Sequence, residues 1–231
     1  MSTSTITEAR RLFDAGLALL PNHPRDKYPP VMGWQTCSFD WTTIERHLRA
    51  GGALGLRMGD DGGETVDVDV KHWVGNEPDE LRQQYEALVE DHAPGLLARL
   101  VIAQTQSGGR HYIYRCTTPE PNQKLAERPP TNEELAANPR ARAATLIETR
   151  GVGGQIQIAP SPGYAVLQGD LAAIPTITAE ERGILLQCAR MLTQIAPFSA
   201  IDTSIARLSH LDNETPPSEV RYAAASSGYL A

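Results

Sequence analysis

The most constraining feature of the sequence is an alternation of apolar and acidic residues from Thr65 to Val70, which reads Thr-Val-Asp-Val-Asp-Val. Successive side chains of a β-strand point to opposite faces, so this pattern predicts a strand with its valines in the core and Asp67 and Asp69 together outside. Their Cα atoms would lie roughly 6.5–7 Å apart. Like charges this close raise each other's pKa unless a cation lies between them. The pair therefore predicts half of a Mg²⁺ or Mn²⁺ site, and the alternative is a solvated strand face.

Length, composition and charge narrow the class of protein. The chain has 231 residues, 41% hydrophobic and 21% charged, as globular proteins do. It has no apolar run of about 18 residues and no signal-peptide pattern at its start, so we expect a cytoplasmic protein without membrane contact. A net charge of −7 disfavours a broad electrostatic surface for nucleic acid. The single cysteines match no zinc-binding spacing, so we expect free thiols at mostly buried positions and no zinc: Cys37, Cys116 and Cys188.

Helical periodicity, with capping signals at most of the starts, predicts the main helices. The expected ends coincide with proline or glycine, which stop a helix. The predicted helices run from a capping box at Thr5 to about Leu20, from a capping box at Thr42 to Leu48, from Asn76 to before Pro94, and from a capping box at Thr178 to Pro197.

Apolar and alternating segments predict strands, several of them joined by short turns. Residues 53–59 and the acidic strand would form a hairpin through the turn at 60–63. Residues 146–150 and 155–159 would form a second hairpin through the glycine-rich turn at 151–154. Further strands are expected at residues 100–105 and 112–114.

Two segments are predicted to be loops, and each is a candidate for a ligand contact. The proline-rich stretch from about residue 117 to 143 is predicted to be a surface insertion with a short helix after Thr131, and its basic residues make it a candidate template-contacting loop. A plain mobile loop is the alternative. Lys27 lies in a proline-rich loop before Trp34 and could meet a phosphate, with a solvated lysine as the alternative.

The turn Ser107-Gly108-Gly109-Arg110-His111 lies between two predicted strands. Glycines let backbone amides approach a ligand, and such amides bind phosphate oxygens. Ser107 adds a hydroxyl, Arg110 a guanidinium suited to phosphate, and His111 a further donor. A glycine-rich hairpin turn with incidental polar residues is the alternative.

A third carboxylate, Glu148, follows on a later strand that also carries Arg150. Three carboxylates that hold two divalent ions beside a triphosphate are what nucleotidyl transfer needs. One ion lowers the pKa of an attacking 3′-hydroxyl, and both stabilise charge on the reacting phosphorus and the leaving pyrophosphate.

In these motifs and their order the chain resembles the archaeo-eukaryotic primase superfamily, and within it the bifunctional primase-polymerase domains of plasmids, phages and mobile elements. The resemblance covers roughly residues 10 to 195. The matching motifs are residues 66–69 for the hydrophobic-Asp-hydrophobic-Asp strand, 107–111 for the serine-glycine-glycine-x-histidine turn, and 147–154 with 159–161 for the third motif.

The resemblance implies an α+β fold, in which an RNA-recognition-motif-like antiparallel sheet packs with an N-terminal α/β part and the active site lies in the cleft between them. It implies that Asp67, Asp69 and Glu148 bind two Mg²⁺ or Mn²⁺ ions as catalytic residues. Nucleotide phosphates would be held by Ser107, Gly108, Gly109, Arg110 and His111, and Arg150 would contact phosphate or template.

The implied function is a template-directed nucleotidyltransferase, a DNA primase or polymerase, acting on NTP or dNTP with a single-stranded DNA template and a primer. Residues 1–198 would form the catalytic domain, and 199–231 a tail toward a helicase or helical region. Two features depart from the family pattern: Glu148 replaces a frequent aspartate, and Gln155 a frequent aromatic residue. The alternatives are a metal-dependent nuclease or phosphodiesterase and an inactive nucleic-acid-binding module.

Overall fold

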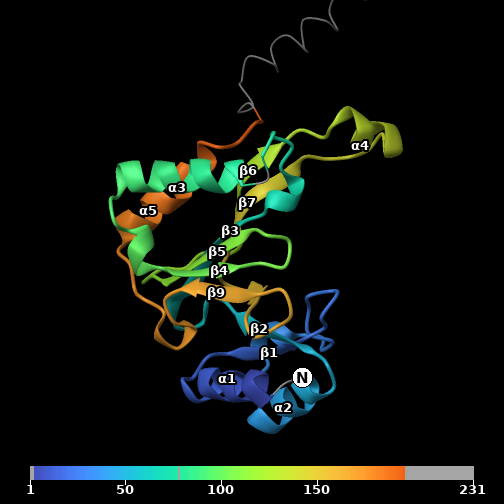
Figure 1. Ribbon diagram of the computed structural model, residues 1–231, viewed down its shortest axis with the longest axis vertical. Helices are drawn as coiled ribbons and strands as arrows, with labels where there is room; N and C mark the ends of the chain where they lie inside the picture. Colours follow the sequence, from blue (N-terminus) through green and yellow to red (C-terminus); the bar gives the residue numbers. More distant parts are fainter. Residues whose placement is uncertain (1–2, 78, 196–231) are drawn as a thin grey trace, which may run out of the picture. The chain divides into compact units, whose positions relative to one another are not determined.

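The computed structural model describes residues 3–77 and 79–195, and their architecture is built on two antiparallel sheets (Figure 1). The strands are β1 (Leu19–Asn22), β2 (Ala53–Arg57), β3 (Gly63–Val68), β4 (Val101–Gln104), β5 (Arg110–Arg115), β6 (Lys124–Arg128), β7 (Ala144–Arg150), β8 (Gln155–Gln157) and β9 (Ala165–Gln168). The large sheet has the order β6-β7-β3-β5-β4-β9, and the small sheet the order β1-β2-β8. This mixture of helices and antiparallel strands confirms the α+β class.

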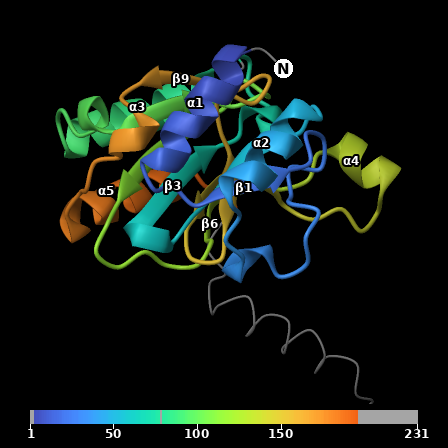
Figure 2. The same cartoon turned by 90° about the horizontal axis from the view of Figure 1, so that it is seen from below.

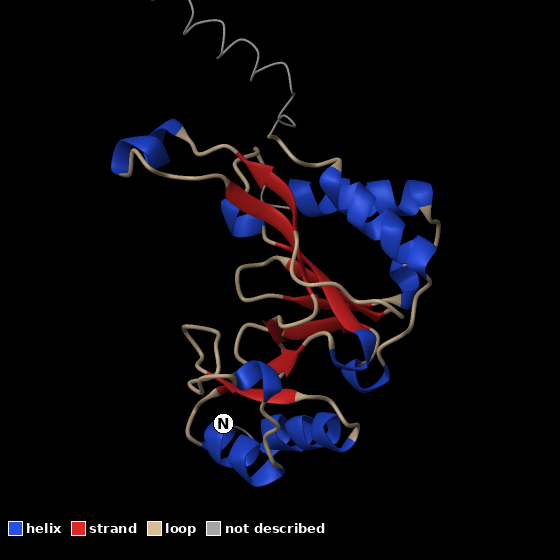
Figure 3. Ribbon diagram, turned by 180° about the vertical axis from the view of Figure 1, so that it is seen from behind, coloured by secondary structure: helices blue, strands red, loops and turns tan. Residues whose placement is uncertain are grey.

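Two pairs of helices cover the sheets, one pair beside each sheet. The α-helices are α1 (Thr3–Asp14), α2 (Trp41–Arg49), α3 (Glu80–His92), α4 (Asn132–Ala137) and α5 (Ala179–Arg190). Figure 3 shows α3 and α5 side by side against one face of the large sheet, and Figure 2 shows α1 and α2 beside the small sheet. Short 3₁₀ turns are η1 (Trp34–Thr36), η2 (Asp60–Gly62), η3 (Val70–His72), η4 (Leu97–Arg99) and η5 (Leu171–Ala173). No helix in this part of the chain is both long and apolar enough to cross a bilayer.

Two hydrophobic cores follow from this layering. The first lies between the large sheet and α3 with α5, where Val66 and Val68 pack as the alternation predicts. The second lies between α1, α2, the small sheet and the opposite face of the large sheet, which contributes Ile113 among others. The large sheet is therefore covered on both faces, which explains why its central strands are almost entirely buried.

The first helix is shorter than predicted. It ends at Asp14, Gly16 adopts a left-handed φ of 84°, and the predicted end of the helix is instead the buried strand β1. Residues 19–22 pair with β2, so tertiary pairing overrides the helical spacing of the leucines. The capping predictions hold only in part: Asp40 rather than Thr42 caps α2, whereas Thr178 forms the predicted capping box with Glu181. Thr5 lies inside α1, and α3 begins at Glu80 rather than Asn76.

Both predicted hairpins are wrong. β2 pairs with β1 and β8 but not β3, while β7 pairs with β3 and β6 but not β8. The segment between β2 and β3 and the segment between β7 and β8 instead carry the chain from one sheet to the other. These two crossover segments contact each other, because Met58 N donates a hydrogen bond to Gly154 O at 3.0 Å. A Cβ at Gly59 would lie 2.6 Å from Val152 Cα, so glycine is needed where the crossovers meet.

The proline-rich segment contains more structure than predicted. Its first half forms the edge strand β6, and the expected short helix is α4, capped by Thr131. Arg128 stabilises the segment of β6 and α4, because its guanidinium donates two hydrogen bonds to Glu134 at 2.8 Å and one to His72 O at 2.6 Å. The predicted tail from residue 199 lies outside the described residues.

Candidate active site

Three predicted site residues lie in a row across the large sheet. Asp67 on β3 is directly opposite His111 on β5 and directly opposite Glu148 on β7. Residues opposite each other in an antiparallel pair share a face, so the three side chains emerge side by side. The face opposite carries Val66 and Val68, which confirms the predicted split of the acidic strand for residues 66–68. The prediction for Val70 is wrong, because it lies in the 3₁₀ turn after the strand and outside the core.

Asp69 lies just beyond the end of this strand. β3 ends at Val68, and Asp69 caps η3, where its side chain accepts a hydrogen bond from Lys71 N at 3.2 Å. Its own backbone N–H still donates to Leu146 O at 2.9 Å, which continues the pairing toward β7. Asp69 therefore keeps its place near the row although it is not in the strand.

Each carboxylate of this group faces a basic side chain. His111 Nε2 lies 3.5 Å from Asp67 Oδ1, Lys71 forms an ion pair with Asp69, and Arg150 forms one with Glu148. In this arrangement the described residues contain no group of three His, Cys, Asp or Glu side chains set to hold a metal ion. The donor set nevertheless fits Mg²⁺ or Mn²⁺, which prefer carboxylate oxygens. Binding would require Lys71 and Arg150 to turn away, and the Lys71 side chain is half exposed.

The protein environment shifts the pKa values of Asp67 and Glu148 in opposite directions. Burial opposes ionisation of Asp67, but the charges of His111, Arg150 and Lys71 outweigh it and lower its pKa below the ordinary value. Burial raises the pKa of Glu148, and the Asp67 carboxylate adds to the rise despite Arg150. Neighbouring carboxylates whose pKa values are shifted in opposite directions are typical of functional sites.

These carboxylates line a pocket of about 410 Å³, within the range of small-molecule sites. One part of its lining comes from the large sheet and its turns, and another from the loop after β1 and from β8. The lining includes Asp26, Lys27, Tyr28, Trp34, Gln35, Asp67, Asp69, Lys71, Thr105, Ser107, His111, Asn122, Glu148, Arg150, Gln155, Gln157 and Tyr164.

The glycine-rich turn joins β4 and β5 as a hairpin. Only some of the residues predicted to bind phosphate at this turn line the pocket. Ser107 and His111 line the pocket, whereas Gly108, Gly109 and Arg110 do not. Arg110 lies on the opposite face from His111, and its Nη1 donates to the carbonyls of Gly108 and Gly109 at 3.0 and 3.1 Å. A Cβ at Gly109 would lie 2.3 Å from Val68 O, so this glycine is needed for packing against β3. The structure therefore gives Arg110 a role in holding the turn.

The pocket also contains residues that the sequence did not single out. Tyr164 lies beside His111, with ring centroids 6.3 Å apart, and its burial raises its pKa to about 12. Lys27, for which a phosphate contact was one alternative, lines the pocket with its Nζ 5.8 Å from the Tyr164 ring. Lys71 follows the acidic strand directly, which is a usable sequence signal, but Asn122 and Gln157 have no motif.

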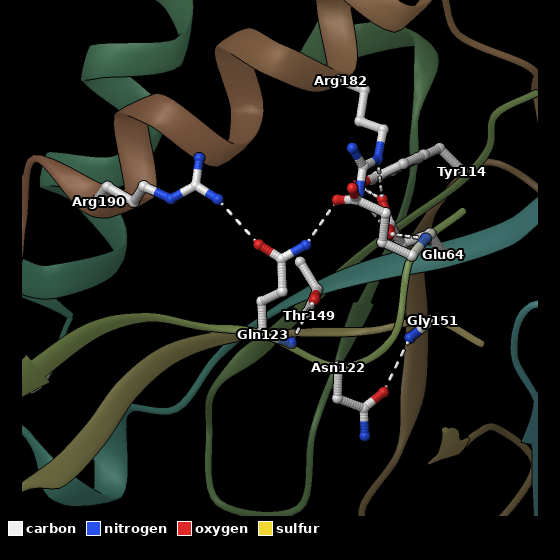
Figure 4. A network of polar contacts seen from close by, with 9 residues as sticks. Glu64, Tyr114, Asn122, Gln123, Thr149, Gly151, Arg182 and Arg190 are labelled. Carbon is white, nitrogen blue, oxygen red and sulfur yellow. Dashed lines mark hydrogen bonds and ion pairs between the residues drawn. The ribbon is translucent and has the colours of Figure 1, made fainter. Parts of the chain in front are cut away.

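A polar network, buried at Glu64 and exposed toward Glu120 and Arg190, links α5 to the large sheet and to the loop before β6 (Figure 4). Arg182 on α5 binds Glu64 and Glu120, and Gln123 links Glu120 to Arg190. The loop that carries these residues also carries Asn122, whose Oδ1 accepts from Gly151 N at 3.0 Å. Of the residues in this network, Asn122 lines the pocket, whereas Arg182 and Glu64 do not.

Comparison with known proteins identifies a family. A family model described as "Bifunctional DNA primase/polymerase, N-terminal" matches residues 9–177, which include both sheets and every pocket residue named above. No curated protein sequence matches the chain significantly.

Proposed function

The chain belongs to the bifunctional DNA primase/polymerase family, and we propose that it adds nucleotides from NTP or dNTP to a 3′-hydroxyl on a DNA template. Family membership implies nucleotidyl transfer in general, with nucleotide and DNA as substrates. The observation that carries the detailed proposal is the opposition of Asp67 and Glu148 across neighbouring strands in a pocket of nucleotide-binding size.

The architecture supports an RNA-recognition-motif-like sheet as the catalytic core. The antiparallel strands β7-β3-β5-β4 form its centre, α3 and α5 cover one face, and the pocket lies on the other. The small sheet with α1 and α2 corresponds to the N-terminal part that the family resemblance implies, although β8 joins it from later in the chain. Because Gln155 and Gln157 of the small sheet line the same pocket as Asp67, the proposed cleft lies between the sheets.

Asp67, Asp69 and Glu148 would hold two Mg²⁺ or Mn²⁺ ions. When bound, such ions lower the pKa of an attacking hydroxyl and stabilise a leaving pyrophosphate. The protein prepares this donor set by placing two carboxylates on adjacent strands and a third at a strand end. In the structure Lys71 and Arg150 neutralise Asp69 and Glu148, which limits the repulsion that three neighbouring carboxylates would otherwise produce.

Phosphate binding is proposed for Ser107, His111, Lys71 and Arg150. All four line the pocket, and the two cations could exchange a carboxylate for a phosphate oxygen when metal binds. The phosphate contacts predicted for Gly108, Gly109 and Arg110 have no such support, since these residues lie outside the pocket lining. We propose that they shape the turn that presents Ser107 and His111.

A primer-extension assay tests this function directly. The purified chain is incubated with a labelled primer on a single-stranded DNA template, Mn²⁺ and either NTP or dNTP. We expect extension by the wild type and a loss of more than about 100-fold in Asp67→Asn, since even residues that only support a metal ligand cost 10–100-fold. Asp170→Asn is the matched control, because this carboxylate lies at the surface and pairs with Arg11. Degradation of the primer, or equal rates in the wild type and Asp67→Asn, would contradict the proposal.

A further inference from the structure

Two glutamines on β8 differ in how their side-chain amides are used. Gln155 and Gln157 are two residues apart on a strand and so share a face. The amide of Gln155 is fully engaged: its Oε1 accepts from Asn22 Nδ2 at 2.8 Å, and its Nε2 donates to Lys27 O at 2.5 Å. Gln157 is only 4% exposed, and its Oε1 is buried without a hydrogen-bond partner among the described residues.

The unpartnered amide of Gln157 points to a ligand. Most buried side-chain polar atoms in proteins have a partner, and an unpaired one destabilises the fold. Val or Leu would pack at a buried strand position without that cost. Gln157 also lines the pocket that contains Asp67 and Glu148, so a molecule bound there can reach it.

A second unpartnered oxygen lies close to the first. The Asn22 amide lies over Gly55, where a Cβ would come within 2.5 Å of Asn22 Nδ2. Gly55 pairs directly with Gln157 across the small sheet. Asn22 Oδ1, like Gln157 Oε1, is buried and has no partner among the described residues. Of these two residues only Gln157 lines the pocket, so its oxygen is the acceptor that calls for a donor there.

We propose that Gln157 binds a hydroxyl group on the sugar of the incoming nucleotide, an inference that rests on the proposed function. Phosphate oxygens are acceptors and are better served by Ser107, His111 and the lysines. A hydroxyl both donates and accepts, so it satisfies an amide in either orientation. The base must leave the pocket to pair with a template. The sugar joins base and triphosphate, and it is the part of the nucleotide that carries free hydroxyls.

The test compares a side-chain deletion with deletions in the ligand. Binding of NTP, dNTP and dideoxy-NTP to the full chain is measured by calorimetry with Mn²⁺ and no DNA, for the wild type and for Gln157→Leu. The wild type should bind the nucleotide that carries the contacted hydroxyl about 5- to 10-fold more tightly than the analogue that lacks it. Gln157→Leu should bind both alike.

The contacted hydroxyl is identified by the two nucleotides whose difference in affinity disappears in Gln157→Leu. If the affinity difference between NTP and dNTP disappears, the contacted group is the 2′-hydroxyl. If the affinity difference between dNTP and dideoxy-NTP disappears, it is the 3′-hydroxyl. Unchanged gaps in Gln157→Leu, or an equal loss for all three nucleotides, would overturn the inference. If the wild type binds and extends with nucleotides while the gaps are unaffected by the substitution, only this inference fails. If the wild type binds no nucleotide, the proposed function fails with it.

Gln155→Leu is the matched comparison, and it also guards against a folding artefact. It removes two internal hydrogen bonds, so its melting temperature should fall. Gln157→Leu removes no side-chain hydrogen bond to the described residues, so it should melt at or above the wild-type temperature. A Gln157→Leu protein that melts well below Gln155→Leu would show that Gln157 is a structural residue, which contradicts the inference. Gln157→Met, an unbranched apolar replacement, should reproduce the loss of discrimination.

Discussion

Glu64 and Asp67 lie three residues apart on β3 and illustrate two uses of a carboxylate. Glu64 is fully buried and accepts from Arg182 Nε at 2.6 Å, Arg182 Nη2 at 2.9 Å and the Tyr114 hydroxyl at 2.6 Å. Asp67 faces His111 at 3.5 Å and opens onto the pocket. In this pair the structural carboxylate is buried and its oxygens are engaged by protein donors, whereas the carboxylate that lines the pocket is partly exposed and has fewer protein partners.

The two faces of the large sheet explain why these neighbours differ. Odd and even positions of a strand face opposite sides, so Glu64 points toward α5 and Asp67 away from it. The helix α5 supplies Arg182, whose pKa is raised above its ordinary value by its hydrogen bonds to Glu64. On the other face, Lys71 and Arg150 form ion pairs with Asp69 and Glu148 and also line the pocket.

The largest effect should come from Arg182→Ala. It leaves Glu64 buried without its charged partner, which typically costs about 3–5 kcal/mol of stability. Urea denaturation measures the loss. Extension activity per folded molecule at low temperature should change little, because Arg182 does not line the pocket. A loss of activity without a loss of stability would reverse the roles assigned to the two faces.

A smaller effect is expected for Lys71→Ala. The half-exposed ion pair with Asp69 contributes at most about 1 kcal/mol to stability. If Lys71 contacts phosphate, its removal should raise the half-saturating nucleotide concentration by roughly 10-fold or more, the range for hydrogen bonds to charged groups. Lys124→Ala is the control, since Lys124 is exposed and pairs with Glu127 outside the pocket. Equal nucleotide dependence in the two variants would remove Lys71 from the phosphate site.

The smallest effect is a pH-dependent gain in stability for Glu148→Gln without metal. The folded-state pKa of Glu148 is raised by burial and by Asp67, so its ionisation disfavours the fold above that pKa. The variant should therefore melt slightly higher than the wild type at pH 7. The gain should vanish below the ordinary carboxylate pKa of about 4.3, where Glu148 is protonated in both states. Melting curves in chelator across this range measure it, and a gain that grows toward low pH would contradict the assignment.

Local pattern predicted the parts of the site that one strand determines. Alternation placed Asp67 and the core valines on opposite faces, and the resemblance assigned Glu148 to the same metal site as Asp67. The same alternation contains the information that Arg110 and His111, adjacent on β5, point to opposite sides. The prediction that all residues from Ser107 to His111 bind phosphate ignored this alternation.

Features that depend on distant pairing were not predictable from local pattern. The segments around Gly59 and Gly154 look like hairpin turns, but each carries the chain between sheets, and only their mutual packing reveals this. Leu19 and Leu20 continue a helical spacing but are held in β1 by β2. Gln157 belongs to no motif, and its importance follows from the lack of a partner in a pocket formed by both sheets.

The most direct test of the account is metal-dependent stabilisation. Mn²⁺ is titrated during thermal melting of the wild type, Asp67→Asn, Glu148→Gln and the surface control Asp170→Asn, with and without dNTP. A ligand at 100 times its dissociation constant stabilises a protein by about 2.7 kcal/mol. The account predicts that Mn²⁺ stabilises the wild type and Asp170→Asn alike, more strongly with dNTP, and that Asp67→Asn and Glu148→Gln lose most of the shift. A Mn²⁺ response in Asp67→Asn and Glu148→Gln equal to that of the wild type would contradict it.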